Sequence, residues 1–342
     1  MPDPTPQPPT PGPRILIVRP SALGDVCRTV PCLVSLRRAL PGAHLDWLVN
    51  APFAPAVASH PMLDGVVPFH RKDFSLGRGL ALARRLRAGR YDTVYDLQGL
   101  LRSGVLTWLT RAPQRVGFAN AREGAALCYN RKHAIDPALH TVERMLGLLE
   151  AAGIEPVRDL RLYVGEDDAA CLDRFIDEHG LREEYTCLAP TAQWRCKCWP
   201  IERYAELAHW IEGPVVVLAA PHEHAQVQPL LEALGERAVF PRTTVGQLIA
   251  LISRCRLLVC NDSAALHIAV AFGKPIVSVF GPTDPARVGP YQRPEAVVQP
   301  ADITPDDMAR YRKHKDDQSL IARVTVEQVR DAMAAQLDQR GD

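Results

Sequence analysis

Three short segments of the sequence carry side chains that can act on an anionic ligand, and each follows an apolar run of strand length. They contain Asp25 after 14–19, Lys197 after 185–189, and Asn261-Asp262-Ser263 after 257–260. A carboxylate such as Asp25 can act as a general base toward a hydroxyl group, or it can simply cap a helix. A lysine and a helix N-terminus can together bind an anion. These residue types therefore indicate a diphosphate site beside a candidate base.

The segment 257–284 has the pattern of a strand, a helix and a second strand. The three parts are 257–260, 264–272 and 276–280. Asn261-Asp262-Ser263 supplies side chains that we expect to cap the helix, and Gly273 occupies the position of a C′ glycine. Because the helix begins at the carboxyl edge of the sheet, where open α/β sheets bind ligands, an anion is expected there. The alternative is an ordinary βαβ unit whose polar residues only cap.

Strand and helix patterns alternate along both halves of the chain. Strands are predicted at 14–19, 44–49, 64–68, 91–97, 185–189, 214–219, 257–260 and 276–280, and 115–118 is predicted to be a short extended segment. This alternation predicts an α/β protein with two doubly wound, Rossmann-like domains that face each other across a cleft. The pattern is interrupted near 153–162. We therefore expect a disordered proline-rich tail over 1–13, domains over 14–155 and 156–324, and a C-terminal helix and tail over 325–342.

The charge of the chain is unevenly distributed although its net value is only +1. Residues 1–150 contain 19 Lys and Arg against 11 Asp and Glu, whereas residues 151–342 contain 21 against 28. The predicted helix 76–88 is especially basic. Such a helix is usually a solvated face, but it can also contact anionic lipid headgroups or an acidic acceptor. We expect no nucleic-acid partner, and a front half that meets something anionic.

Several patterns that would indicate other chemistry are missing from the sequence. Only Gly24 occurs where a dinucleotide-binding loop needs several glycines. The cysteines, including Cys196-x-Cys198, do not have zinc-site spacing, and no Asp-x-Asp pair follows an apolar strand. We therefore expect no metal and no other cofactor. No apolar run approaches the ~20 residues of a membrane span, and 1–13 lacks the apolar core of a signal peptide, so a cytoplasmic protein is expected.

Three motifs, in order, resemble those of the bacterial heptosyltransferases of glycosyltransferase family 9. They are SALGDVCRTVP at 21–31, RCKCWP at 195–200, and NDSAALHIAVAFGKPIVSVFGPTDPARVGPY at 261–291. The resemblance extends over 14–336 and implies the GT-B fold. Residues 121–133, His140, 142–144, 96–99 and Ser103 are similar to heptosyltransferase I, which adds the first heptose to Kdo-lipid A. The implied reaction is inverting transfer from ADP-heptose to the Kdo inner core of lipopolysaccharide.

The resemblance also implies a role for individual residues. Asp25 is the expected base, and Lys197 is expected to stabilise the departing ADP. The donor is expected to contact Thr191, Lys197, Glu223, Asp262, Ser263, Ala264 and His267, and the acceptor Ser21, Gly24, Gln98, Arg102, Arg122 and Lys132. Asp262 is expected to cap the helix or meet a donor hydroxyl rather than phosphate. His267 can touch phosphate or sugar, or can be a core histidine.

The expected partners are ADP-heptose, an anionic lipid-linked Kdo acceptor and the cytoplasmic face of the inner membrane, where a monomer would bind peripherally. Three alternatives stay open at this point. The chain can be a GT-B enzyme for another nucleotide sugar, or it can use another inner-core acceptor, as heptosyltransferase II does. It can also be a nucleotide-sugar-binding protein without catalytic activity.

Overall fold

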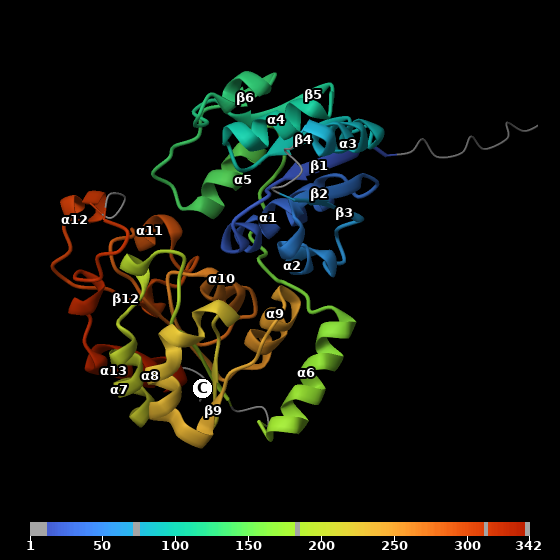
Figure 1. Cartoon of the computed structure of the whole chain (residues 1–342). Coiled ribbons are helices and arrows are strands. Elements are labelled where there is room, and N and C mark those ends of the chain that lie inside the picture. Colours follow the sequence, from blue (N-terminus) through green and yellow to red (C-terminus); the bar gives the residue numbers. More distant parts are fainter. Residues whose placement is uncertain (1–11, 71–75, 182–184, 311–313, 339–342) are drawn as a thin grey trace, which may run out of the picture.

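The computed structural model describes residues 12–70, 76–181, 185–310 and 314–338, and these contain two parallel sheets flanked by helices (Figure 1). The predicted α/β class with two doubly wound sheets is therefore confirmed. Apart from its last two residues, the expected tail 1–13 lies outside the described residues. The domain limits at 155 and 324 stay predictions.

The first sheet lies in the N-terminal part of the chain. Its strands are β1 (Arg14–Val18), β2 (His44–Asn50), β3 (Gly65–Phe69), β4 (Thr93–Asp96), β5 (Gln114–Phe118) and β6 (Arg131–His133), in the order β3-β2-β1-β4-β5-β6. Its helices are α1 (Leu23–Ala39), α2 (Pro55–Ala58), α3 (Leu76–Ala88), α4 (Leu101–Leu109) and α5 (Thr141–Ala151). One face is covered by α1, α2 and α5, and the opposite face by α3 and α4.

The second sheet repeats this topology. Its strands are β7 (Thr186–Ala189), β8 (Val215–Val217), β9 (Ala238–Val239), β10 (Leu257–Asn261), β11 (Ile276–Val279) and β12 (Val297–Val298), in the order β12-β11-β10-β7-β8-β9. Its helices are α6 (Glu166–His179), α7 (Ile201–Leu207), α8 (His224–Leu234), α9 (Val245–Arg254), α10 (Ala264–Ala271), α11 (Pro285–Val288), α12 (Pro305–Arg310) and α13 (Val326–Asp338). The C-terminal helix α13 packs onto the outer side of this sheet with α7 and α8.

The central strands were predictable because they are apolar and buried on both faces, as parallel strands are. All five residues of β10 are buried, as are the last four of β1. The strands β6, β9 and β12 were missed because they contain only two or three residues. The left-handed φ of 62° at Gly273 confirms the predicted C′ glycine, since this conformation is unfavourable for residues with a side chain.

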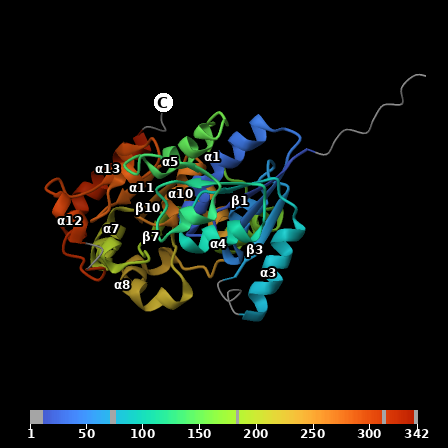
Figure 2. The ribbon, with the colours of Figure 1, turned by 90° about the horizontal axis from the view of Figure 1, so that it is seen from above.

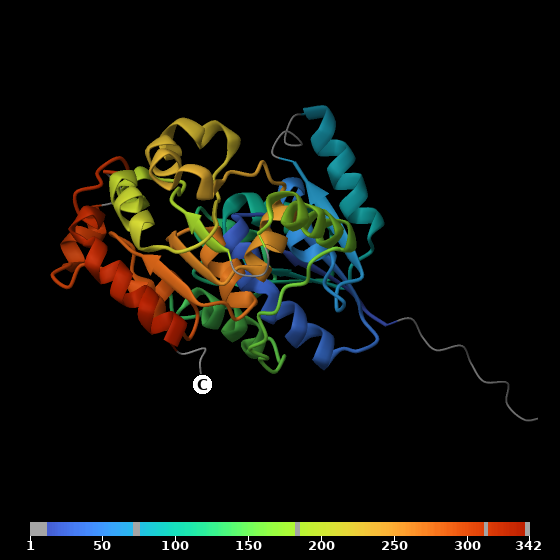
Figure 3. The same ribbon diagram turned by 90° about the horizontal axis from the view of Figure 1, so that it is seen from below.

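The two domains share a buried apolar layer. It contains residues of α1 and α5 from the first domain and of α9 and α10 from the second (Figures 2 and 3). The helices α1 and α10 approach closely, because a Cβ added to Gly24 would lie 2.6 Å from Cδ2 of His267. The strand order reverses between β1 and β4 and again between β7 and β10. Ligands of doubly wound folds bind at such reversals, so the two reversals together indicate a binding site in the space beside α1 and α10.

Candidate active site

A cleft of about 560 Å³ lies at the two strand-order reversals and is lined by residues of both domains. Ten of the residues predicted for the site line it: Ser21, Gly24, Asp25, Gln98, Arg102, Lys197, Asp262, Ser263, Ala264 and His267. They come from the ends of β1, β4 and β10 and from the loop after β7. Residues some 240 positions apart in the sequence are thus brought to one cavity, as the fold prediction requires.

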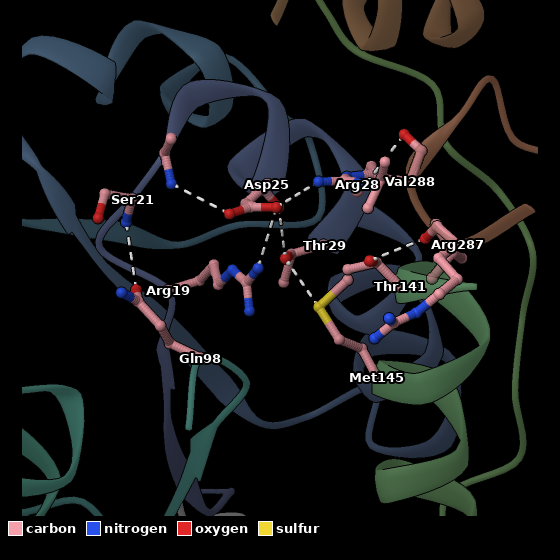
Figure 4. A network of polar contacts seen from close by, with 12 residues as sticks. Arg19, Ser21, Asp25, Arg28, Thr29, Gln98, Thr141, Met145, Arg287 and Val288 are labelled. Carbon is pink, nitrogen blue, oxygen red and sulfur yellow. Dashed lines mark hydrogen bonds and ion pairs between the residues drawn. The ribbon is translucent and has the colours of Figure 1, made fainter. Parts of the chain in front are cut away.

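Asp25 occupies the first turn of α1, and its two carboxylate oxygens have different partners (Figure 4). Oδ1 is paired with Nη2 of Arg19 at 3.2 Å and accepts a short hydrogen bond from Nη2 of Arg28. Oδ2 accepts the Ala22 N–H at 3.2 Å. The side chain is 27% exposed. Since two guanidinium groups occupy Oδ1, Oδ2 is the oxygen better placed to take a proton from a ligand.

The electrostatic surroundings of Asp25 favour its ionised form. Burial by itself raises the pKa of the carboxyl, but the charges of Arg19 and Arg28 and the Ala22 N–H outweigh it and hold the pKa well below its ordinary value. The carboxylate is therefore available as a base throughout the physiological pH range. Its basicity is low while both arginines are bound.

The lowered pKa of Asp25 predicts a pH-dependent contribution to stability. The contribution is complete above the unfolded-state pKa of about 3.9 and is lost as pH falls below that value toward the folded-state pKa. Urea unfolding of the native chain and of Asp25→Asn should therefore differ by a constant free energy between about pH 8 and pH 5. The difference should shrink below about pH 4. A difference that grows with acidification would contradict the assigned ion pairs.

Arg19 and Arg28 were not identified from the sequence, and each links Asp25 to a second element. Arg19 donates through Nη1 to the Leu97 carbonyl at the end of β4. Arg28 donates through Nη1 to the Val288 carbonyl at 3.2 Å, across the domain boundary (Figure 4). Beside it, Thr141 donates to the Arg287 carbonyl at 3.1 Å. The sequence held one local indication of the Asp25–Arg28 pair: Arg28 lies one helical turn after Asp25, so the two side chains can meet on one side of the helix.

Lys197 forms an ion pair with Asp262, at 2.6 Å between Nζ and Oδ2. Thr283 Oγ1 donates to the same oxygen at 2.9 Å, and the Trp194 ring centroid lies 5.2 Å from Nζ. The side chains of Lys197 and Asp262 are 17% and 9% exposed. An ammonium group has three donors, so Lys197 can keep this pair and still donate to a phosphate. Asp262 thereby fixes a cation in the cleft.

The predicted side-chain capping of α10 is wrong. Ser263 is the N-cap residue but makes no side-chain capping bond, and Asp262 turns to Lys197 and Thr283 instead. Asn261 is buried; its Oδ1 accepts the Trp199 N–H at 3.0 Å and its amide donates to Pro190. A cation from a neighbouring loop competes better for the Asp262 carboxylate than backbone N–H groups do. Within the described chain, the first-turn N–H groups of α10 therefore have no side-chain cap.

His267 lies on α10 at the boundary between the cleft and the shared core. It lines the cleft, yet its residue exposure is only 5%, and it packs against Gly24. Burial, followed by the nearby charge of Arg28, lowers the pKa of the imidazole well below its ordinary value. His267 is therefore neutral and can offer a hydrogen bond to a ligand but no charge. Its position is therefore compatible both with a histidine that touches the ligand and with a core histidine.

The remaining predicted residues lie away from the main cavity. Thr191 Oγ1 donates to Glu223 Oε2 at 3.0 Å, and that oxygen also accepts the Ala220 N–H at 2.7 Å. This hydrogen bond joins the loops after β7 and β8. Arg122 and Lys132 are exposed and are not among the lining residues. Gln98 does belong to the cleft, and its Oε1 accepts the Ser21 N–H at 3.3 Å.

The described residues contain neither a candidate metal site nor a membrane-spanning helix. In these ranges no three His, Cys, Asp or Glu side chains are arranged to hold a metal ion. The same part of the chain has no helix of the length and hydrophobicity that crossing a bilayer requires. Among the described residues, the Lys and Arg side chains that line the cleft are Arg28, Arg102 and Lys197, and Arg19 is paired with Asp25 from outside the lining.

Sequence comparison finds relatives along most of the chain. The model of glycosyltransferase family 9 (heptosyltransferase) matches residues 79–313. Lipopolysaccharide heptosyltransferase 1 of Pseudomonas aeruginosa is 32% identical over 298 residues, which are 82% of each chain. Lipopolysaccharide heptosyltransferases 2 and 3 of Escherichia coli are each 26% identical, over 84% and 76% of this chain and 88% and 80% of their own.

Solved structures of similar fold include two transferases. A glycosyltransferase family 9 protein from Veillonella parvula has a TM-score of 0.82 at 24% identity, and the match covers 96% of this chain and 97% of that one. The Escherichia coli heptosyltransferase WaaC, solved with ADP, has a TM-score of 0.74 at 27% identity, with coverages of 94% and 99%.

Proposed function

Since the chain belongs to glycosyltransferase family 9 and is a glycosyltransferase with the GT-B fold its motifs predict, we propose that it transfers heptose from ADP-heptose to the Kdo inner core of lipopolysaccharide. The observation that carries this proposal is the cleft itself. It holds an ionised carboxylate, Asp25, on one wall, and a fixed cation with an uncapped helix N-terminus on the other. These are the groups that a sugar transfer from a nucleotide diphosphate needs.

The proposed reaction is a direct displacement at the anomeric carbon of the donor. The acceptor hydroxyl forms the new C–O bond and gives its proton to Asp25 Oδ2, while the bond from the anomeric carbon to the diphosphate breaks. Because the hydroxyl attacks opposite the leaving group, the anomeric configuration inverts. Positive charge builds on the sugar and negative charge on ADP. Lys197 and the N–H groups of Ser263 and Ala264 stabilise the departing anion.

The proposed donor subsite extends from these phosphate-binding groups toward β8. Thr191 lies in the loop after β7 and would contact the donor phosphates. Glu223, its hydrogen-bond partner, would meet the adenosine ribose through a carboxylate oxygen. No metal takes part in this scheme, because Lys197 and the helix N-terminus supply the compensating positive charge.

The proposed acceptor subsite is the wall formed by the first domain. Ser21, Gln98 and Arg102 line the cleft there, near Asp25. A guanidinium such as Arg102 suits the Kdo carboxylates, because planar, bidentate pairs with carboxylates are strong. We propose that Arg122 and Lys132, outside the cleft, meet phosphates of the lipid A part. Heptosyltransferase 1 relatives support the first-heptose acceptor, and a cytoplasmic location facing the inner membrane follows from that acceptor.

Transfer assays with purified substrates test this function. We expect product from ADP-heptose with Kdo-lipid A, and a rise in melting temperature with ADP-heptose, since only a ligand of the native state raises it. UDP- and GDP-sugars at equal concentration are the matched controls and should give neither. If they stabilise the protein and ADP-heptose does not, the donor assignment is wrong. If only an acceptor already carrying one heptose reacts, the activity is that of heptosyltransferase 2.

A further inference from the structure

The outer helical layer of the first domain carries exposed apolar side chains in an unusual concentration. Among the described residues, six large hydrophobic side chains are exposed, and four of them lie in this layer: Leu80, Leu101, Trp108 and Leu127. Trp108 is 55% exposed and Leu127 is 87% exposed. Leu101 and Trp108 are seven residues apart and therefore lie on the same side of α4.

Packing brings these side chains onto one surface. The turn Ala125–Cys128 packs against α4, because a Cβ on Gly104 would lie 3.2 Å from Ala125. On its other side α4 meets α3, where Leu106 shares an apolar cluster with Leu82 and Leu86. The elements that carry Leu127 and Leu80 thus lie on either side of α4, which bears Trp108. We call this surface, formed by α3, α4 and residues 125–128, the outer face.

The outer face lies within residues 76–133, and this segment also holds the net positive charge of the N-terminal half. Residues 76–133 contain 11 Lys and Arg against three Asp and Glu, one of which, Asp96, is fully buried. This excess of eight equals the whole excess of residues 1–150. The exposed cations are Arg78, Arg84, Arg85, Arg90, Arg102, Arg111, Arg122, Arg131 and Lys132. Exposed apolar and cationic side chains therefore belong to the same segment, and its helix α3 lies on the side of the molecule away from α12 and α13 (Figure 2).

We propose that the outer face is a docking surface for an anionic lipid bilayer. Trp108, Leu101 and Leu127 insert at the boundary between headgroups and acyl chains, where tryptophan is favoured. The exposed arginines of α3, Arg78, Arg84 and Arg85, pair with anionic headgroups, and each such cation adds to the attraction. A segment that exposes both apolar side chains and cations matches a lipid surface in both respects. This proposal rests on the proposed function, because docking to a bilayer serves the reaction only if the acceptor is linked to a lipid.

Docking through the outer face would bring the cleft close to an acceptor that is embedded in the bilayer. Leu101 belongs to the outer face, and the next residue, Arg102, lines the cleft. The mouth of the cleft therefore opens beside the inserted side chains. A headgroup sugar can reach Asp25 while its acyl chains stay in the bilayer, so the lipid need not be extracted. The donor wall of the second domain remains on the aqueous side.

Trp210 provides a matched control in the second domain. It is 58% exposed, almost the same as Trp108, but it lies next to α7 and the Arg330 guanidinium carbon is 4.8 Å from its ring centroid. Its domain lies in the half of the chain with the acidic excess. Exposure of an aromatic ring alone therefore does not distinguish the two tryptophans, whereas the net charge of the half of the chain that carries each of them does.

Vesicle binding tests the docking surface. The full chain should bind vesicles of phosphatidylcholine with phosphatidylglycerol, should bind pure phosphatidylcholine weakly, and should dissociate with added salt. The double variant Trp108→Ser/Leu127→Ser should bind the anionic vesicles at least about tenfold more weakly. Trp210→Ser should bind as the native chain does. Equal losses in the two variants, or native binding that ignores lipid charge, would overturn the proposal.

A second measurement separates this proposal from the proposed function. With a deacylated, water-soluble Kdo acceptor, Trp108→Ser/Leu127→Ser should keep the native kcat/KM. With acceptor embedded in vesicles its kcat/KM should fall about in proportion to vesicle binding. Equal loss with both acceptors would place the two residues in the fold or site and refute docking. Native transfer to soluble acceptor without vesicle binding refutes docking alone. Vesicle binding without transfer to any acceptor refutes the function alone.

Discussion

Asp25→Asn is expected to lower kcat by a factor of about 10² or more while ADP-heptose binding stays at its native level. Asparagine has the same shape, and its oxygen can still accept from Arg28 or from the Ala22 N–H. It cannot take a proton from the acceptor hydroxyl. Because Asp25 lies on the wall opposite Lys197 and Asp262, the donor contacts are unchanged. The variant should therefore lose turnover but keep its affinity for the donor. If Asp25 had a purely structural role, both quantities would change together.

Asp64 offers the control for this variant. Its carboxylate is also held by an arginine, Arg37, and by a backbone N–H, that of Leu45 at 2.7 Å, but it lies away from the cleft. Asp64→Asn should keep native turnover. Donor binding is measured by calorimetry, and turnover by release of ADP. If Asp25→Asn turns over at the native rate, Asp25 is not the base.

Lys197→Ala is expected to lower kcat by about 10² to 10³, because the departing diphosphate loses its fixed cation. The same change leaves the Asp262 carboxylate, 9% exposed, without its ion-pair partner. Its negative charge would then face the incoming diphosphate, so donor affinity should fall as well. The melting temperature should fall too, since an unpaired buried charge is costly.

A second variant separates the effect of Lys197 on chemistry from its effect on stability. Lys197→Ala/Asp262→Asn removes both charges, so it should recover melting temperature without recovering turnover. Lys315→Ala is the matched control, because Lys315 Nζ lies 4.9 Å from the centroid of the same Trp194 ring but is exposed. It should keep native turnover. Equal losses in Lys197→Ala and Lys315→Ala would show that general positive charge, and not the paired lysine, is what the reaction uses.

The architecture was largely predictable, because buried parallel strands such as β1 and β10 are apolar runs that the sequence displays directly. Asp25, Lys197 and Ser263 were found because they follow such runs, and the ends of parallel strands meet at one edge. Local patterns do not record which side chains meet across that edge. Asp262 was assigned to its own helix because capping is a local rule, whereas its partner lies 65 residues away. Arg28 was missed for the same reason, since its carbonyl partner is 260 residues distant.

The bond from Arg28 to Val288 has a consequence for how this enzyme can diverge and be rebuilt. The second domain contributes only a backbone carbonyl to it, and only carbonyls again where Thr141 and His140 touch Arg287 and Gly289. A carbonyl is present whatever the side chain is. Donor domains of different sequence can therefore be exchanged onto this acceptor domain without losing the partner of Arg28, provided the backbone path over 287–289 is kept. Among the described residues, only the bonds of the Arg287 and Tyr291 side chains to Pro137 and Glu143, at the same boundary, would depend on the residues that the exchanged domain brings.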